Sequence, residues 1–204
     1  MALGIGLGYE ISSLKSITIK LICVDVPVLI LVWSFVKYRG PVRTLALLIG
    51  RYPSVKEFMK WACIGMILNA RTFITSAMHG TYYESLEYVA FILIATFSSS
   101  LIYPIAEEVL FRGFCYTALR KYGKWCAFVI STLLFLLAHV PLNDAISGVF
   151  PLSMFHVAFF VAISAIATHI YESSGSLLLC ITFHGAANFM DGAGQFVRYL
   201  SSQL

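Results

Sequence analysis

The amino-acid sequence predicts an all-α fold, a polytopic membrane bundle of about seven transmembrane helices. Hydrophobic residues make up 59% of the 204 residues and charged residues only 12%. A soluble domain is about half apolar and about one-quarter charged. Apolar stretches that approach the roughly 20 residues needed for one crossing recur along the chain. The helix count has a range of six to eight, and residues 1–204 are expected to form a single integral-membrane domain.

The predicted helices follow one another along the chain as apolar stretches. The second stretch is weaker than the others, because it carries Lys60, Asn69 and Arg71. In chain order the stretches are Ile17–Val36, Phe58–Met78, Leu86–Tyr103, Ile105–Tyr122, Trp125–Val140, Pro151–Tyr171 and Leu177–Val197.

Residues that break helices separate these stretches. Pro104 is expected to end one helix before the next begins, because residues 86–122 joined together are too long for one crossing. Gly123 marks a turn within KYGK at 121–124, and loops are expected at 140–151 and 172–176. The apolar run at 44–50 is too short to span a bilayer.

The connection between the first two stretches, with the first residues of the second, is basic. It has one acid, Glu57, against six bases: Lys37, Arg39, Arg43, Arg51, Lys56 and Lys60. This excess predicts a cytoplasmic location. No sustained alternation of aromatic and basic residues follows, so no nucleic-acid partner is predicted.

The turn near Gly123 carries Arg120, Lys121 and Lys124, and seven crossings place these bases outside, against the charge rule. If 86–122 crosses only once, the sides reverse from there on. The first arrangement is preferred, because it avoids an overlong helix.

The five cysteines all lie in apolar stretches, and none belongs to a CxxC pair. They are predicted to be small buried hydrophobic residues without a disulfide framework. The cysteines are Cys23, Cys63, Cys115, Cys126 and Cys180.

The stretch PIAEEVLFRG at 104–113 places three charges in apolar surroundings. Glu108 and Arg112 are four residues apart on one helix face, with the acid first, which is the favourable order for an ion pair. Glu107 points about 100° away. It must therefore find a partner on another helix or become protonated.

The next predicted helix offers a partner for Glu107. Glu107 lies 16 residues before Gly123, and His139 lies 16 residues after it. In an antiparallel hairpin that turns at Gly123, the two side chains sit at the same depth. A carboxylate beside an imidazole in apolar surroundings is an arrangement for general-base chemistry. Phe135 lies one turn before His139 and is expected to wall this site.

The last predicted helix contains HGAAN at 184–188. His184 and Asn188 share a face, and the small residues between them permit close helix packing. Imidazole and amide donors on one face suit an oxyanion that develops during a reaction.

Structural interpretations stand beside these functional ones. A Glu–Arg pair in a membrane helix can be purely structural, and Asp25, Asn69 and Arg71 are either packing partners or substrate contacts. Single histidines are usually satisfied polar residues, which is the interpretation given to His79, His156 and His169. Ionisable residues inside a membrane are nevertheless functional by default, which favours a site here.

The motifs EExxxR, FxxxH and HxxxN occur in that order in EEVLFR, FLLAH and HGAAN. In these three motifs and their order the chain resembles the CPBP family of CAAX proteases and bacteriocin-processing enzymes, which includes the type II CAAX prenyl endopeptidase. The motif-bearing core covers about 86–197. The resemblance implies an all-α membrane bundle that cleaves a peptide bond with a glutamate-activated water, without a cofactor or bound metal. It assigns Glu107 as general base, His139 as its partner on the water, Glu108 and Arg112 as the supporting pair, and His184 and Asn188 as oxyanion stabilisers.

Two alternatives remain open at this point. Two histidines and a glutamate are a plausible zinc ligand set, although the sequence contains no HExxH. A non-proteolytic immunity or scaffold protein of the same family is the other alternative. The partners implied are the lipid bilayer and a membrane-associated peptide or protein, either prenylated or a leader peptide. The expected location is the plasma membrane of a bacterium, with several membrane crossings.

Overall fold

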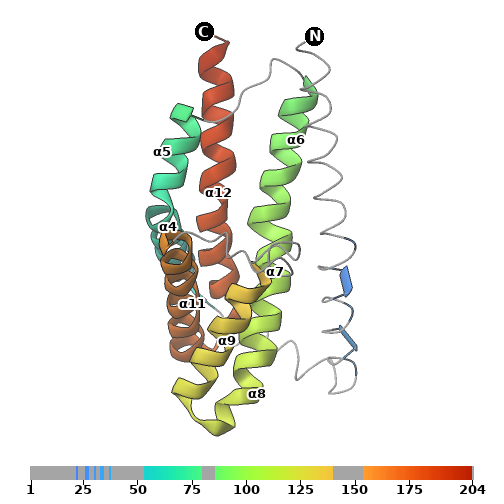
Figure 1. The fold of residues 1–204 in the computed structure, drawn as a ribbon, viewed down its shortest axis with the longest axis vertical. Coiled ribbons are helices and arrows are strands. Elements are labelled where there is room, and N and C mark those ends of the chain that lie inside the picture. Colours follow the sequence, from blue (N-terminus) through green and yellow to red (C-terminus); the bar gives the residue numbers. More distant parts are fainter. Residues whose placement is uncertain are drawn as a thin grey trace. The chain divides into compact units, whose positions relative to one another are not determined.

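A computed structural model describes residues 53–79, 86–139 and 154–203, together with scattered positions between 22 and 37. Four predicted features lie outside these residues or are covered only in part: the helix at 17–36, the run at 44–50, Asp25 and the loop at 140–151. The elements of the described ranges are α4 (Val55–Leu68), α5 (Ala70–His79), α6 (Leu86–Phe97), η2 (Ser98–Ile102), α7 (Tyr103–Glu108), η3 (Val109–Tyr116), α8 (Thr117–Leu119), η4 (Arg120–Tyr122), α9 (Lys124–Ala138), α11 (Met154–Ser174) and α12 (Leu177–Ser202) (Figure 1).

The all-α prediction is confirmed for these ranges, in which every element is helical. Among the described residues, two helices are long and apolar enough to cross a membrane, Tyr88–Tyr122 and Met154–Ser174. Lys124–Ala138 is apolar but shorter. The number of about seven transmembrane helices stays a prediction.

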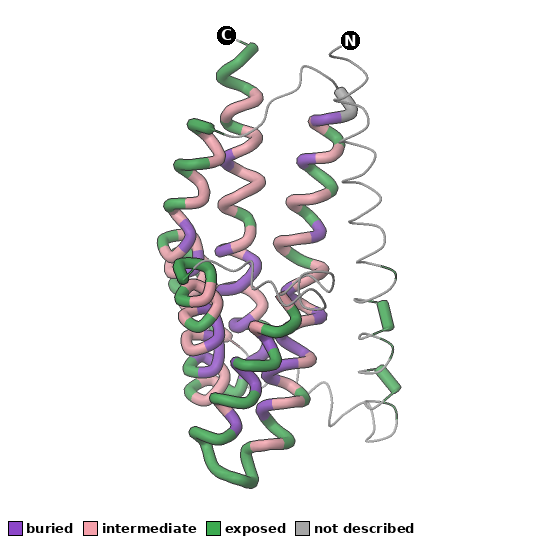
Figure 2. The backbone as a smooth tube through the Cα atoms, viewed as in Figure 1, coloured by how far each residue is buried: buried purple, intermediate pink, exposed green. Residues whose placement is uncertain are grey.

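Apolar side chains on the outside of α9 agree with a lipid environment. Val129, Leu133 and Leu137 are spaced four residues apart, and their exposed fractions are 50%, 53% and 59%. Figure 2 shows that exposed residues recur along this helix. A continuous apolar stripe of this kind is uncommon on a soluble monomer, and a bilayer gives it an apolar surrounding.

The predicted break at Pro104 is wrong, because the chain is helical without interruption from Leu86 to Tyr122. Two π-helical segments, η2 and η3, lie on either side of α7. At the end of η2 the N–H of Tyr103 donates to the carbonyl of Ser98, five residues back instead of four. Proline has no N–H to donate, and a wider π-helical turn accommodates it inside a helix.

Ser99 and Ser100 precede Pro104 by five and four residues. Because proline has no N–H, the carbonyl of Ser99 in a π-helical turn, or that of Ser100 in an α-helical turn, loses its donor. Helix α12 meets both of them. The side-chain amide of Asn188 donates to the Ser99 carbonyl at 2.9 Å. Gly185 faces the Ser100 carbonyl so closely that a Cβ atom there would lie 2.2 Å from the oxygen.

The described helices form two compact units. One contains Val55–Ala106 and Ile181–Leu204, and the other contains Glu107–Cys180. The prediction of one integral-membrane domain over 1–204 stays a prediction.

In the first unit, α12 lies between α5 and α6 (Figure 1). A Cβ atom on Gly192 would meet the side chain of Thr96 on α6, which shows how closely the two helices approach. On the other side Asn69, at the break between α4 and α5, donates to the Ala187 carbonyl at 2.8 Å. Asn69 thus serves helix packing, one of the two roles that its position left open.

In the second unit, α9 packs on η3 and α11 packs on α9. The predicted turn at Gly123 is confirmed: this residue has φ +112°, which only glycine adopts readily. Gly175 has φ +67° and follows the end of α11. The predicted loop at 172–176 is therefore shorter than expected, because α11 continues through Ser174.

The prediction of buried cysteines is wrong for two of the four that the structure describes. Cys63 and Cys126 are exposed, Cys115 is intermediate and only Cys180 is buried, and all four are free. The apolar stretch around a membrane cysteine does not indicate burial, because lipid-facing and core-facing positions are equally apolar. Cys23 lies outside the described residues.

The close approach of Gly185 to Ser100 generates a stability prediction. Gly185→Ala forces a Cβ atom against a backbone oxygen, and such overpacking typically costs about 1–3 kcal/mol or more. Gly113→Ala is the matched control, because the nearest atom to its Cβ is the flexible tip of Leu177 at 3.0 Å and the nearest backbone oxygen, that of Glu108, lies at 3.9 Å. Thermal unfolding of the purified proteins in detergent should show a clear loss for Gly185→Ala and little change for Gly113→Ala. Equal midpoints for both variants would contradict this packing.

Candidate active site

The predicted ion pair of Glu108 and Arg112 forms the buried part of the candidate site. Arg112 Nη1 donates to Glu108 Oε1 at 2.9 Å, and the two side chains are 0% and 1% exposed. Burying two charges is costly unless they are paired and hydrogen-bonded. The carbonyl of Arg112, in the π-helical segment, accepts a hydrogen bond from Thr117 Oγ1 at 2.9 Å. The pair is therefore fixed at both its side chains and its backbone.

Phe135 joins this ion pair to the next helix. The Arg112 guanidinium carbon lies 4.9 Å from the centre of the Phe135 ring, a cation–π distance. The edge of Phe111 meets the same ring at 5.2 Å between centres. Phe135 is fully buried on α9. These contacts hold the last turn of α9 against η3. His139, the predicted partner of Glu107, follows directly after this turn.

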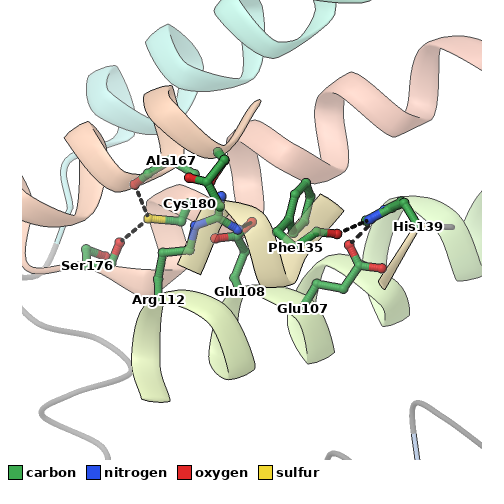
Figure 3. A network of polar contacts seen from close by, with 10 residues as sticks. Glu107, Glu108, Arg112, Phe135, His139, Ala167, Ser176 and Cys180 are labelled. Atoms are coloured by element: carbon green, nitrogen blue, oxygen red, sulfur yellow. Dashed lines mark hydrogen bonds and ion pairs between the residues drawn. The ribbon is translucent and has the colours of Figure 1, made fainter. Parts of the chain in front are cut away.

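His139 follows the last residue of α9 and bonds back to that turn. Its backbone N–H donates to the carbonyl of Leu136 at 3.0 Å. Its ring nitrogen Nδ1 lies 2.8 Å from the carbonyl oxygen of Phe135 (Figure 3). Because a carbonyl only accepts, Nδ1 must carry the hydrogen in this bond. In the neutral imidazole, Nε2 is then the nitrogen with the free electron pair.

Glu107 faces that nitrogen. Its Oε2 lies 3.8 Å from His139 Nε2, and the side chains are 14% and 19% exposed. Figure 3 shows both side chains converging from α7 and from the end of α9. The predicted proximity of Glu107 and His139 is confirmed as geometry, and their roles stay predictions. A distance of 3.8 Å is too long for a direct hydrogen bond.

The two groups together suit the activation of a water molecule. A carboxylate oxygen and an unprotonated Nε2 are both acceptors. One water with its two hydrogens directed at them keeps its own electron pairs for attack, and either group can take a proton from it. The partial exposure of both side chains leaves a route for water, in contrast to the sealed Glu108–Arg112 pair.

The third motif lies in the first unit, on α12. His184 is buried, and Asn188 donates to the Ser99 carbonyl. That bond uses one of the two hydrogens on the amide nitrogen. The convergence of His184 and Asn188 with Glu107 and His139 stays a prediction, as does their oxyanion role.

Sequence reasoning missed the aromatic neighbour of His139 on α11. The centre of the Phe160 ring lies 4.2 Å from the centre of the imidazole. Thr132 and Ser164, both buried, exchange a hydrogen bond at 2.8 Å and join the same two helices. The FF pair at 159–160 carries no periodic signal that distinguishes a site residue from a lipid-facing one, because apolar residues surround it on every face of this part of α11.

A second missed feature is a polar cluster around Glu172, at the end of α11. Arg120 Nε and Lys124 Nζ lie 2.9 Å and 3.4 Å from its carboxylate, and Tyr116 donates to it at 2.8 Å. These contacts join the turn at Gly123 to the end of α11. The sequence did contain a signal for this cluster: Glu172 follows one apolar stretch, and Arg120 and Lys124 lie at the end of another.

The remaining predicted residues contribute less to the geometry of this site. The described residues contain no group of three or more His, Cys, Asp and Glu side chains that could hold a metal ion. His79, His156 and His169 lie on α5 and α11, and they retain the structural interpretation given above. Arg71, on α5, keeps both of its proposed roles.

Apolar helices and an acid–imidazole pair beside a buried ion pair define a helical membrane protein with a candidate hydrolytic site. The family profile described as type II CAAX prenyl endopeptidase Rce1-like matches residues 89–190, half of the chain and all six candidate positions. The chain therefore belongs to this family, whose members are peptidases and integral membrane proteins. No curated protein and no solved structure matches the chain.

The buried ion pair generates a prediction with an internal control. Glu108→Ala or Arg112→Ala leaves an uncompensated buried charge, at a cost of about 3–5 kcal/mol. Both variants should give less folded protein and a lower unfolding temperature. Arg120→Ala breaks an exposed ion pair, for which about 0–1 kcal/mol is typical. If all three variants unfold at the wild-type temperature, the buried pair does not carry this stability.

Proposed function

We propose that the protein is an intramembrane endopeptidase of the glutamate type, in which Glu107 and His139 activate a water molecule to cleave a peptide bond. The observation that carries this proposal is the separation of Glu107 Oε2 and His139 Nε2 by 3.8 Å, with the other imidazole nitrogen bonded to the Phe135 carbonyl. Membership of a peptidase family supports it.

The mechanism follows from the donors and acceptors of the pair. The oxygen of the water forms a bond to the substrate carbonyl carbon while Glu107 takes one of the water's protons. His139 Nε2 accepts a hydrogen bond from the second hydrogen of the water. The tetrahedral intermediate then collapses, and the carbon–nitrogen bond breaks. Glu107 gives the proton to the leaving nitrogen and is a carboxylate again, ready for the next turnover.

The oxyanion of the intermediate needs donors that form stronger bonds to it than to the ground-state carbonyl. We assign this role to His184 and to the second amide hydrogen of Asn188. Glu108 and Arg112 support the site indirectly, because they hold the ring of Phe135, whose carbonyl orients His139. No metal ion takes part in this scheme.

The proposed membrane arrangement has about six crossings, within the predicted range. The continuous helix Tyr88–Tyr122 has no turn at which to reverse, so it crosses once and the sides after it are exchanged. Arg120, Lys121 and Lys124 then lie in the cytoplasm, in agreement with the positive-inside rule. The ion pairs of Arg120 and Lys124 with Glu172 support a common side for the turn and the end of α11. The membrane is proposed to be the plasma membrane of a bacterium.

The substrate is proposed to be a membrane-associated peptide or protein, either prenylated at its C-terminus or carrying a leader. Family membership supports the membrane-associated kind of substrate. The non-proteolytic immunity or scaffold role is the alternative within the same family. A Glu107→Gln protein that keeps its full biological activity would favour that alternative.

Glu107→Gln tests the proposed base. The amide has nearly the same shape but takes no proton, so cleavage should fall about 10²-fold or more while the unfolding temperature stays near that of the wild type. Cleavage is followed by mass spectrometry on a panel of farnesylated and leader peptides. His139→Ala should cause a loss of the same order, because both groups act on one water. Activity of Glu107→Gln within a few-fold of the wild type would rule out this base.

Asn188→Ala separates two roles of the amide. Loss of one oxyanion donor typically lowers turnover about 10²–10³-fold, with little change in the substrate concentration at half-maximal rate. Loss of the part-buried bond to the Ser99 carbonyl removes the contribution of one ordinary hydrogen bond, about 0.5–1.5 kcal/mol. We expect both effects. A stability loss with turnover unchanged would show that Asn188 serves only the backbone of the helix before Glu107.

A further inference from the structure

His139 needs support from outside its own helix. It follows the last residue of α9, and its backbone dihedrals, φ −97° and ψ −1°, already depart from the helical values. A side chain at a helix end is less constrained by its backbone than one in the middle. The bond from Nδ1 to the Phe135 carbonyl fixes one edge of the ring, and the orientation of the ring plane depends on the groups that pack against its faces.

Phe160 supplies a contact from α11. The centres of its ring and of the imidazole are 4.2 Å apart, with an angle of 38° between the planes. Phe135 meets the imidazole at 4.6 Å, and the two phenylalanine rings lie 6.0 Å apart. The three rings thus contact one another, and the imidazole lies in a corner formed by residues of two helices.

The position of Phe160 is set by a polar contact further along the same two helices. Thr132 on α9 and Ser164 on α11 share a buried hydrogen bond at 2.8 Å. Ser164 lies one turn after Phe160, and Thr132 lies two turns before His139. In this antiparallel register Phe160 lies level with Phe135, about one turn after Thr132, and the two rings are in contact. The imidazole of His139 bonds back to the Phe135 carbonyl at the same level, so the register also brings Phe160 to the imidazole.

We propose that Phe160 is a positioning residue for His139, an inference that rests on the proposed function. The corner formed by Phe160 and Phe135 keeps the imidazole from rotating about its bond to Cβ. A half-turn of the ring would replace Nε2 by a carbon atom at the point facing Glu107, and the water would lose one of its two acceptors. Phe160 acts only through His139 and touches no reacting atom.

Steady-state cleavage by three variants tests this role. Phe160→Leu keeps an apolar side chain but removes the flat ring, and Phe160→Tyr restores the ring. Misplacement of a catalytic group by about 1 Å can cost roughly 10²-fold, so kcat of Phe160→Leu should fall about 10-fold to 10²-fold with KM changed little. Phe160→Tyr should recover most of the loss. Phe159→Leu is the control, because it removes a neighbouring ring that lies 5.8 Å from the centre of the Phe160 ring and leaves Phe160 itself in place.

A second measurement does not depend on catalysis. Nitrogen NMR of the histidine-labelled protein reports which imidazole nitrogen carries the hydrogen, and His139→Gln identifies the signal. The wild type and Phe159→Leu should show the form with hydrogen on Nδ1, and Phe160→Leu should show a mixture of both forms. If the wild type cleaves no peptide, the proposed function fails, but the NMR comparison still tests the contact.

Two results would overturn the inference. One is a Phe160→Leu protein with wild-type kcat and a single hydrogen position on His139. The other is a loss that follows the unfolding temperature alone and that Phe160→Tyr does not recover, because this would make Phe160 a packing residue. If Phe160→Leu does not fold, Thr132→Val provides the test, since it loosens the register without altering any ring. Wild-type kcat and hydrogen position in that variant would then contradict the inference.

Discussion

The candidate site depends on a buried ion pair, Glu108 with Arg112. A lone charge at either position would be too costly in apolar surroundings, so each residue requires the other. Once paired, the guanidinium lies against the ring of Phe135, and the carbonyl of Phe135 holds His139 Nδ1. The EExxxR and FxxxH motifs are therefore one physical unit, in which the phenylalanine connects the ion pair to the histidine. Glu107 differs from its neighbour because it is left partly accessible to water.

The irregular helix that carries both glutamates imposes a second requirement. Its π-helical segments and Pro104 leave carbonyl groups without their usual donors, and a buried carbonyl needs a partner. Thr117 serves the Arg112 carbonyl, and Asn188 serves the Ser99 carbonyl, while Gly185 lets α12 approach Ser100. The HGAAN motif thus supports the backbone before Glu107, in addition to the oxyanion role that we propose for it.

The sequence predicted what local geometry determines. The spacing of Glu108 and Arg112 along one helix, and the equal distances of Glu107 and His139 from Gly123, were enough to find both pairs. The break at Pro104 was wrong because π-helical turns and a neighbouring helix accommodate the proline. Phe160 was missed because its contact depends on the register of α9 and α11, which the Thr132–Ser164 bond sets across 32 positions of the chain. Cys63 and Cys126 were misjudged because apolar sequence does not distinguish a core from a lipid-facing surface.

We propose that a carboxylate and an imidazole, without a metal, direct a water molecule at a peptide bond. Cleavage of the peptide panel by purified, metal-depleted protein in bilayers, in water enriched in heavy oxygen, tests this directly. One peptide should be cleaved, and its new C-terminal carboxylate should carry one solvent oxygen. Intact peptides throughout, or cleavage that returns only when zinc is added, would contradict it.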